Sequence, residues 1–282
     1  MIGATARYEA VMPKSAAPAP RGSRSKVGGG RVLMWRGGSL WVSRDTGLVQ
    51  PHAHHAIQVT LAPRQPVKLR SEDGATWVAA HASIVMPDRE HQFDGCGQDV
   101  AILLLEPETK AGRMLLARYG QASLTVIPDD AVNQASQRLL DGLASRASDA
   151  TLVESAQAIV GLLAGHVPEV DAVDPRITRA LDWIRGHLDG PITLGQVAGV
   201  AHLSPSRFRH LFVAQTGISF RAYVLWSRVS AGMVAAMAGQ SWTEAAQNAG
   251  FADSAHFTRT CRRMFGISPT MLDRGKPAAP GG

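Results

Sequence analysis

The sequence has few cysteines and no long apolar run. Two cysteines in 282 residues, Cys96 and Cys261, are too few and too far apart for a disulfide framework or a four-thiolate metal site. The longest apolar run, Val100 to Leu105, is much shorter than the ~18–20 residues that cross a membrane. Residues 1–30 contain no continuous apolar segment, so we expect no secretory signal there. These absences predict a cytoplasmic protein without membrane contact.

Motifs of enzymes are also missing. The sequence contains neither a Ser-His-Asp arrangement nor the spacing of a phosphate loop, and the run Gly28-Gly29-Gly30 is too simple to indicate a phosphate cradle. We therefore predict that the protein is not an enzyme and needs no cofactor.

The net charge of +6 is unevenly distributed along the chain. Residues 174–275 hold 11 Lys and Arg against 6 Asp and Glu, and residues 1–31 hold 6 against 1. Residues 32–173 instead hold 11 against 16. A basic module attached to an acidic one suggests that only the basic module approaches a polyanion.

From Arg31 to about Ile127 the pattern changes to short apolar runs separated by Gly, Pro and Asp. Runs with this spacing are typical of a small antiparallel barrel. The expected strands are residues 32–35, 39–42, 56–61, 75–79, 83–86 and 100–105. Residues 128–147 and 152–166 then have the periodicity of two amphipathic helices.

Composition places the boundaries between these regions. Residues 1–30 are rich in Ala, Pro, Gly and basic side chains and have no apolar periodicity, which is typical of disorder. The segment around Pro168 and Pro175 is polar and suits a linker. We predict a disordered basic tail (1–30), a barrel with two helices (31–167), a linker (168–175), a helical domain (176–275) and a disordered tail (276–282).

Two helix-turn-helix patterns lie in tandem near the C-terminus, in residues 193–212 and 242–259. Positions before the turn recur at an offset of 48, as Ala198 does at Ala246, and later positions recur at an offset of 49, as Gly217 does at Gly266. The second copy therefore has one extra residue in its turn. Two copies predict two DNA-reading elements.

The local chemistry of each copy supports a capped helix that buries one face. Ser204 is expected to cap the second helix of the first copy, with Pro205 in its first turn and Gly217 as its left-handed stop. In the second copy Asp253 or Ser254 is expected to cap. An ordinary helical hairpin with a solvated polar face would explain one copy, but it explains the shared caps, apolar spacing and glycines of both copies less well.

At these residues the chain resembles the AraC family of bacterial transcription regulators. The resemblance covers about residues 176–273. It is most specific in Gly250-Phe251-x-Asp253-Ser254-x-x-Phe257-x-Arg259 and Phe265-Gly266-x-Ser268-Pro269, and it departs at Cys261, where the family usually has Phe. It implies two helix-turn-helix subdomains joined by a long helix from Ser219 to about Ala238.

The resemblance also implies which side chains contact double-stranded DNA. Arginine in the major groove favours guanine, because its two donors meet two acceptors there. The expected base contacts are Ser206, Arg209 and His210 in the first recognition helix, and Ser254, Ala255, His256 and Arg259 in the second. The expected phosphate contacts are Arg207, Thr258, Arg262 and Arg263.

A group of histidines lies in the predicted barrel. Pro51-His52-Ala53-His54-His55 is expected to open a strand and resembles a reduced cupin pattern, with His52 and His54 on one face as metal ligands would be. The glutamate expected after such a pair is missing, and Glu72 or Glu90 would have to complete a metal site. We therefore favour an effector pocket without metal over metal ligands. Its expected polar lining is His52, His54, His55, Gln58 and His91.

Three classes of function remain open at this point. The favoured one is a sequence-specific transcriptional regulator with an α+β fold. We expect it to be an activator that contacts RNA polymerase, and to be controlled by a small-molecule effector or by dimerisation through the barrel. A cupin-type metal-binding sensor or metalloenzyme fused to a DNA-binding domain would explain only the histidines. A DNA-repair methyl acceptor would need several zinc-binding cysteines, which Cys96 lacks.

The two amphipathic helices of the barrel domain offer an apolar surface for a homodimer. Packing of the same positions on the barrel is an equally good explanation. The positions are Val132, Leu139, Leu140 and Leu143 on the first helix and Leu152, Ile159, Leu162 and Leu163 on the second.

Overall fold

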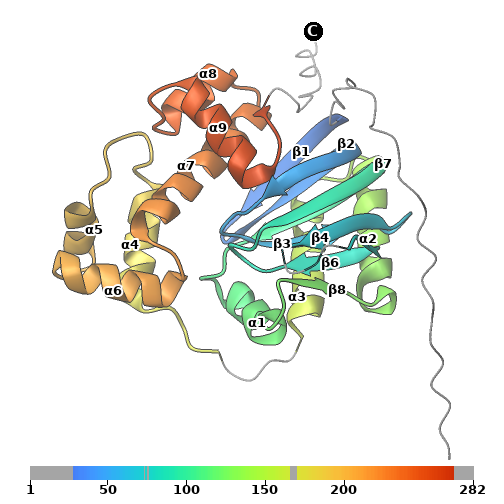
Figure 1. Cartoon of the computed structure of the whole chain (residues 1–282), viewed down its shortest axis with the longest axis horizontal. Coiled ribbons are helices and arrows are strands. Elements are labelled where there is room, and N and C mark those ends of the chain that lie inside the picture. Colours follow the sequence, from blue (N-terminus) through green and yellow to red (C-terminus); the bar gives the residue numbers. More distant parts are fainter. Residues whose placement is uncertain (1–27, 73, 75, 166–169, 270–282) are drawn as a thin grey trace, which may run out of the picture.

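The computed structural model describes residues 28–72, 74, 76–165 and 170–269. In these residues an antiparallel β-domain precedes an all-helical domain (Figure 1), so the predicted α+β architecture is confirmed. The two predicted tails lie outside the described residues, except for Gly28 to Gly30, which begin the first strand. Pro168 and Glu169 of the predicted linker also lie outside them.

The β-domain contains one sheet in which each strand pair is antiparallel. The strand order is β1-β2-β7-β3-β6-β8, with β4 between β5 and β7. The strands are β1 (Gly28–Trp35), β2 (Gly38–His52), β3 (Ile57–Leu61), β4 (Val67–Ser71), β5 (Val78–Ala80), β6 (Ala82–Val85), β7 (His91–Leu105) and β8 (Leu124–Val126).

The long strand β7 holds the sheet together because it changes partner along its length. Its first part pairs with β4, where Ser71 lies opposite His91, and its last part pairs with β3. Strand β2 runs along its other edge, with register shifts that let the pair bend. The same strand therefore holds His91 at its start and a buried apolar segment at its end.

Three helices complete the β-domain: α1 (Lys110–Tyr119), α2 (Asp129–Ala144) and α3 (Asp149–Ala164). The structure confirms the two helices predicted after the sheet, while α1 was not predicted. Helices α2 and α3 cover one face of the sheet and share its main apolar core (Figure 1). Of the eight positions considered for a dimer interface, six are buried there and Leu143 is half-buried. Leu162 is 55% exposed, so packing within one chain accounts for the others.

The helical domain consists of α4 (Pro175–Arg185), α5 (Leu194–Val200), α6 (Pro205–Thr216), α7 (Phe220–Met237), α8 (Trp242–Asn248) and α9 (Ser254–Phe265). Helices α5 and α6 form the first helix-turn-helix unit, and α8 and α9 form the second. Helix α7 joins them, capped by Ser219 and ending at Ala238 as predicted. None of the described helices is both long and apolar enough to span a bilayer.

The ends of the two recognition helices, α6 and α9, are built alike. Ser204 caps α6 through the Arg207 N–H, and Asp253 caps α9 through the His256 N–H at 2.6 Å. Gly217 and Gly266 end these helices with φ of 80° and 67°, in the left-handed region where glycine is favoured. The predicted caps and stops are therefore confirmed, with Asp253 rather than Ser254 as the second cap.

The turns inside the two units differ by the predicted single residue. Residues 201–204 separate α5 from α6, and residues 249–253 separate α8 from α9. Both turns use a left-handed residue at the same place, His202 with φ 53° and Gly250 with φ 75°. A β-carbon on Gly250 would lie 2.2 Å from the carbonyl oxygen of Leu188, so this position requires glycine.

Candidate nucleic-acid interface and histidine cluster

The outer faces of α6 and α9 are exposed. Each of the seven residues predicted to contact bases is exposed, whereas Phe208, Phe212 and Phe257 on the opposite faces are fully buried. The recognition helices thus turn their apolar sides to the core and leave polar side chains free to enter a groove of DNA.

The predicted phosphate contacts lie on the same helices. Arg207, Arg262 and Arg263 are exposed, and Thr258 is half-buried. Among the described residues, no arginine of α6 or α9 forms a salt bridge. Their charge is therefore available to DNA phosphates without the loss of an internal ion pair.

The C-terminal end of α9 is docked on β2 (Figure 1). The Gln50 N–H donates to the Gly266 carbonyl at 3.2 Å, and the Ala53 N–H donates to the Arg263 carbonyl at 3.4 Å. A β-carbon on Gly266 would lie 2.3 Å from the Gln50 carbonyl oxygen and 2.7 Å from Nδ1 of His52. One end of the second recognition helix is thus fixed against the β-domain.

Apolar side chains seal this contact between the domains. Ala56 and Leu104 of the β-domain share one buried cluster with Trp226, Met233 and other residues of α7 and α9. The rings of Trp41 and Phe265 lie 5.7 Å apart across the same contact. Cys261, where the family usually has Phe, is buried in this cluster, and its Sγ lies 3.6 Å from Sδ of Met233.

A polar network lies at the other side of the contact. Arg185 of α4 donates to Glu106 at 2.6 Å and to the Tyr223 hydroxyl at 3.1 Å. His55 bonds to Glu108 at 2.5 Å and to Asp88 at 3.1 Å. Burial alone would lower the pKa of His55, but the hydrogen bonds to these two carboxylates raise it to about 9. His55 is therefore a charged partner in this network.

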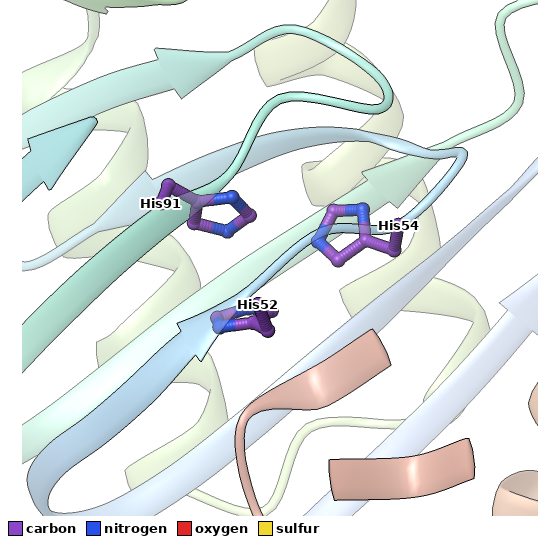
Figure 2. Close-up of side chains that lie close together, drawn as sticks. All are labelled: His52, His54 and His91. Carbon is purple, nitrogen blue, oxygen red and sulfur yellow. The ribbon is translucent and has the colours of Figure 1, made fainter. Parts of the chain in front are cut away.

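Three other histidines converge nearby. His52 is the last residue of β2, His54 lies in the connection to β3, and His91 is the first residue of β7 (Figure 2). The expectation that the histidine pair opens a strand is wrong, because Pro51 and His52 still pair within β2. The chain then turns before β3, and this turn brings His54 back over the strand end. All three are at most 4% exposed, and one ring nitrogen from each lies within 4.8 Å of the others.

Hydrogen bonds fix the orientation of each of these rings. Nδ1 of His52 bonds to the Gln50 carbonyl at 2.8 Å, with corresponding bonds from His54 to Ala56 at 3.0 Å and from His91 to Arg89 at 2.9 Å. Burial lowers the pKa of His52 to about 3 and lowers the pKa values of His54 and His91 as well. The three imidazoles are therefore neutral at physiological pH.

Gln58 of β3 lies between two of the rings. Its Oε1 is 3.1 Å from Nε2 of His54 and 3.2 Å from Nε2 of His91, and its Nε2 donates to the Thr60 hydroxyl at 3.1 Å. The structure thus gathers four of the five predicted effector residues, whereas His55 belongs to the separate carboxylate network.

A cavity of about 80 Å³ adjoins these side chains. Met233 and Phe265 of the helical domain close it, and its polar lining comes from Ser43, Thr46, His52, His54 and Gln58. A second cavity of about 240 Å³ lies between Leu104 of the sheet and Trp226 of α7. Both cavities lie where the two domains meet.

The acidic residues considered for a metal site lie elsewhere. Glu72 pairs with Arg89 at 3.6 Å, and Glu90 is exposed. Neither joins the three histidines. Sequence reasoning also missed Glu106, Glu108 and Tyr223, because their roles depend on contacts between distant elements, for which the local pattern gives no signal.

Comparison with known proteins places the helical domain in a defined class. The family model described as "Helix-turn-helix domain" matches residues 197–275. The chain is 25% identical to the probable transcriptional regulator LumQ of Photobacterium leiognathi over 225 residues, which cover 78% of this chain and 90% of LumQ. It is 32% identical to the arabinose operon regulatory protein of Escherichia coli over 105 residues, 36% of either chain.

The whole architecture also occurs in solved structures. ToxT from Vibrio cholerae O395 superimposes with a TM-score of 0.54, covering 83% of this chain and 97% of ToxT at 12% identity. ToxT bound to (E)-4-(8-methylnaphthalen-1-yl)but-3-enoic acid gives a TM-score of 0.50, covering 84% of this chain and 98% of ToxT at 10% identity. At these identities the likeness shows the shared fold of sheet domain and helical domain.

Proposed function

We propose that the chain is a transcriptional regulator of the AraC family, which reads promoter DNA with α6 and α9 under the control of its β-domain. The observation that carries the proposal is the different setting of two similar recognition helices. Both present exposed polar faces, and α9 is additionally hydrogen-bonded to β2.

The proposed base contacts are the residues named from the family motif: Ser206, Arg209 and His210 on α6, and Ser254, Ala255, His256 and Arg259 on α9. Their exposure and the absence of internal ion pairs at these arginines, among the described residues, support the assignment. Arg207, Thr258, Arg262 and Arg263 are proposed to contact phosphates. Two helices on one rigid domain would occupy major-groove segments about 34 Å apart, one turn of DNA.

The β-domain is proposed to act as the sensor. Residues 31–167 would bind a small effector where the domains meet, residues 168–175 would link the domains, and residues 176–275 would bind DNA. His52, His54 and Gln58 are proposed effector contacts because they line a cavity that α7 and α9 close. His91 is proposed with them because its Nε2 lies 3.2 Å from Oε1 of Gln58. ToxT, which shares the fold, has been solved with a small organic acid bound.

The proposed output is activation through contact with RNA polymerase, as the family resemblance implies.

A homodimer formed through the β-domain remains part of the proposal. Since α2 and α3 already bury most of their apolar positions within one chain, the position on these helices that is exposed for contact with a second copy is Leu162 of α3.

Selection of bound fragments from genomic DNA, followed by footprinting, tests this function. We expect a short set of related sites, each protected over two successive major-groove segments on one side of the helix. A footprint confined to a few base pairs would contradict the assignment of two reading helices. Equal affinity for selected and random DNA would contradict sequence-specific regulation itself.

A further inference from the structure

We propose that the sensor ligand is a divalent transition-metal ion, held by His52, His54 and His91, and that its binding controls the docking of α9. The inference rests on the proposed function and names the ligand class of the same site. It also reverses the expectation from sequence, which favoured an effector pocket without metal.

The first argument concerns lone pairs. A backbone carbonyl can only accept a hydrogen bond, so the bonds to Gln50, Ala56 and Arg89 place a proton on Nδ1 of each ring. Nε2 is therefore the ring atom that each histidine has left to offer as a ligand. In His54 and His91 this atom faces another acceptor, Oε1 of Gln58. Acceptors that converge in a buried space are stabilised by a cation between them.

The second argument is the resemblance of these bonds to the outer shell of known metal sites. Histidine ligands almost always donate their other ring N–H to a carbonyl or carboxylate, which fixes the ring and its tautomer. All three histidines have such a carbonyl partner. His52 and His54 come from the end of β2 and the connection directly after it, and His91 comes from the start of β7, so two backbone segments distant in sequence fix the ligand positions.

Ligand type and size define the class of ion. Imidazole nitrogens suit zinc, copper, nickel and iron, whereas Mg²⁺ and Ca²⁺ require oxygen ligands. Around tetrahedral zinc, with bonds of about 2.1 Å, ligand nitrogens lie roughly 3.4 Å apart. Here one ring nitrogen of each histidine lies within 4.8 Å of the others, so the rings would move toward the ion by about an ångström on binding. Gln58 Oε1 or a water would supply the fourth ligand.

The adjoining space is too small for the alternative ligand. Pockets for drug-sized organic molecules have volumes of roughly 300–1,000 Å³. The cavity beside His52, His54 and Gln58 measures about 80 Å³. It can hold an ion with water molecules, whereas an organic effector would have to displace the helical domain.

Closure of the rings would reach α9 directly. Nδ1 of His52 bonds to the Gln50 carbonyl, and the N–H of the same Gln50 bonds to Gly266 at the end of α9. The ring of His54 lies 5.7 Å from that of Trp226 and 6.4 Å from that of Phe265. A ligand that moves these rings therefore moves the part of the β-domain to which the end of α9 is bound. By linkage, metal and DNA must change each other's affinity by the same factor.

A simpler arrangement makes the opposite prediction. If the Gln58 side chain turns so that its NH₂ group donates to both Nε2 atoms, the cluster is satisfied without an ion. The histidines would then only stabilise the barrel, and metal would bind no better to the native chain than to variants of the cluster.

The test is a metal titration of the full chain, purified without a histidine tag and stripped with a chelator. We expect one Zn²⁺ or Ni²⁺ per chain by calorimetry, and Co²⁺ bound at the same site should show the visible absorption of a low-symmetry complex. His52→Gln and His91→Gln should each weaken binding by at least about 100-fold, since even outer-shell partners contribute 10–100-fold.

His81→Gln is the matched control. His81 lies in the same domain, and its Nδ1 bonds to the Ala62 carbonyl at 2.9 Å, but it stands outside the cluster. It should bind metal as the native chain does, and circular dichroism should show all variants folded. Equal binding by the native chain and His52→Gln, or no stoichiometric binding, would overturn the metal assignment, as would an organic compound that raises the Tm of the stripped chain through these residues.

DNA binding separates this inference from the proposed function. Metal should change the affinity of the native chain and of His81→Gln for a selected site by at least about fivefold, and should leave that of His91→Gln unchanged. If the stripped chain finds its sites and metal has no effect, the function stands and the metal switch is wrong. If no site is found with or without metal, the function itself fails.

Discussion

The first helix-turn-helix unit, α5 with α6, and the second, α8 with α9, use the same local chemistry in different surroundings. Each unit begins with a capping box, at Thr193 in the first and at Ser241 in the second, and each recognition helix ends at a left-handed glycine. The space around these glycines differs. A β-carbon on Gly217 would meet nothing within 4 Å, whereas one on Gly266 would strike β2.

The difference shows where regulation can act. Figure 1 places α5 and α6 at the far end of α7 from the sheet, while α9 lies over β2. The first unit reaches the β-domain through Gln215, which accepts from Arg113 at 3.3 Å. The two copies thus differ in their surroundings: α6 lies away from the sheet, whereas the end of α9 is hydrogen-bonded to the β-domain.

Substitution of the turn glycine should have the largest effect. Gly250→Ala forces a side chain into the left-handed region and against the Leu188 carbonyl, and strain and overpacking together should cost about 3 kcal/mol of stability. His202→Gly, at the matching position of the first unit, should change stability by less than about 1 kcal/mol. Urea denaturation followed by circular dichroism measures both. Equal costs would show that the two turns are not constrained differently.

The glycines that end the recognition helices should give the next largest effect. Gly217→Ala introduces left-handed strain alone and should cost about 1 kcal/mol. Gly266→Ala adds contact with Gln50 and His52, and should cost about 2–3 kcal/mol or separate α9 from the sheet. Limited proteolysis and thermal melting of the full chain check this. The proposed docking predicts extra cleavage near β2 in Gly266→Ala and no such change in Gly217→Ala.

Loss of one arginine from each recognition helix compares the two units on DNA. Arg209→Ala and Arg259→Ala should each weaken a selected site by about 2 kcal/mol and random DNA much less, because guanine readout is lost. Arg138→Ala, on an exposed position of α2, is the control and should leave both affinities unchanged. Gel-shift titrations at fixed salt measure this. An equal loss on selected and random DNA would assign the arginine to phosphate.

The smallest effect is expected where the first unit touches the β-domain. Oε1 of Gln215 accepts from Arg113 and from the Asp174 N–H at 2.9 Å, both in a partly exposed region. Gln215→Ala should therefore cost no more than about 1 kcal/mol and leave DNA specificity unchanged. Urea denaturation and the gel-shift titrations check it. A clear loss of DNA specificity in Gln215→Ala would mean that the β-domain acts on DNA binding through the first unit.

Much of the helical domain could be predicted from the sequence because its signals are local. Ser204, Gly217 and the stripe of Phe208 and Phe212 act on residues within four positions, and the duplication repeats each signal. The exposed faces of α6 and α9 follow directly from that stripe. The extra residue in the second turn could be predicted from the change of offset alone.

The β-domain was harder to predict because its structure depends on distant pairs. Strand β4 alternates polar and apolar residues over only five positions and gains its place by pairing with β7. The apolar pattern of residues 31–127 predicts barrel strands across the stretch that contains α1, although Thr109 caps a helix there. The histidine cluster joins residues 39 positions apart, His52 and His91, whose approach is set by the register of β2 against β7.

The docking of α9 on β2 also affects how the DNA specificity of this regulator can be changed by substitution. Substitutions on the exposed face of α6 have to suit DNA and the helical core, and apart from Gln215 they can be varied in a library without disturbing a contact with the β-domain. Substitutions near the end of α9 have to preserve Gly266 and the contact with Gln50 as well. A search for altered specificity should therefore diversify α6 first, and keep the end of α9 constant so that its contact with the β-domain survives.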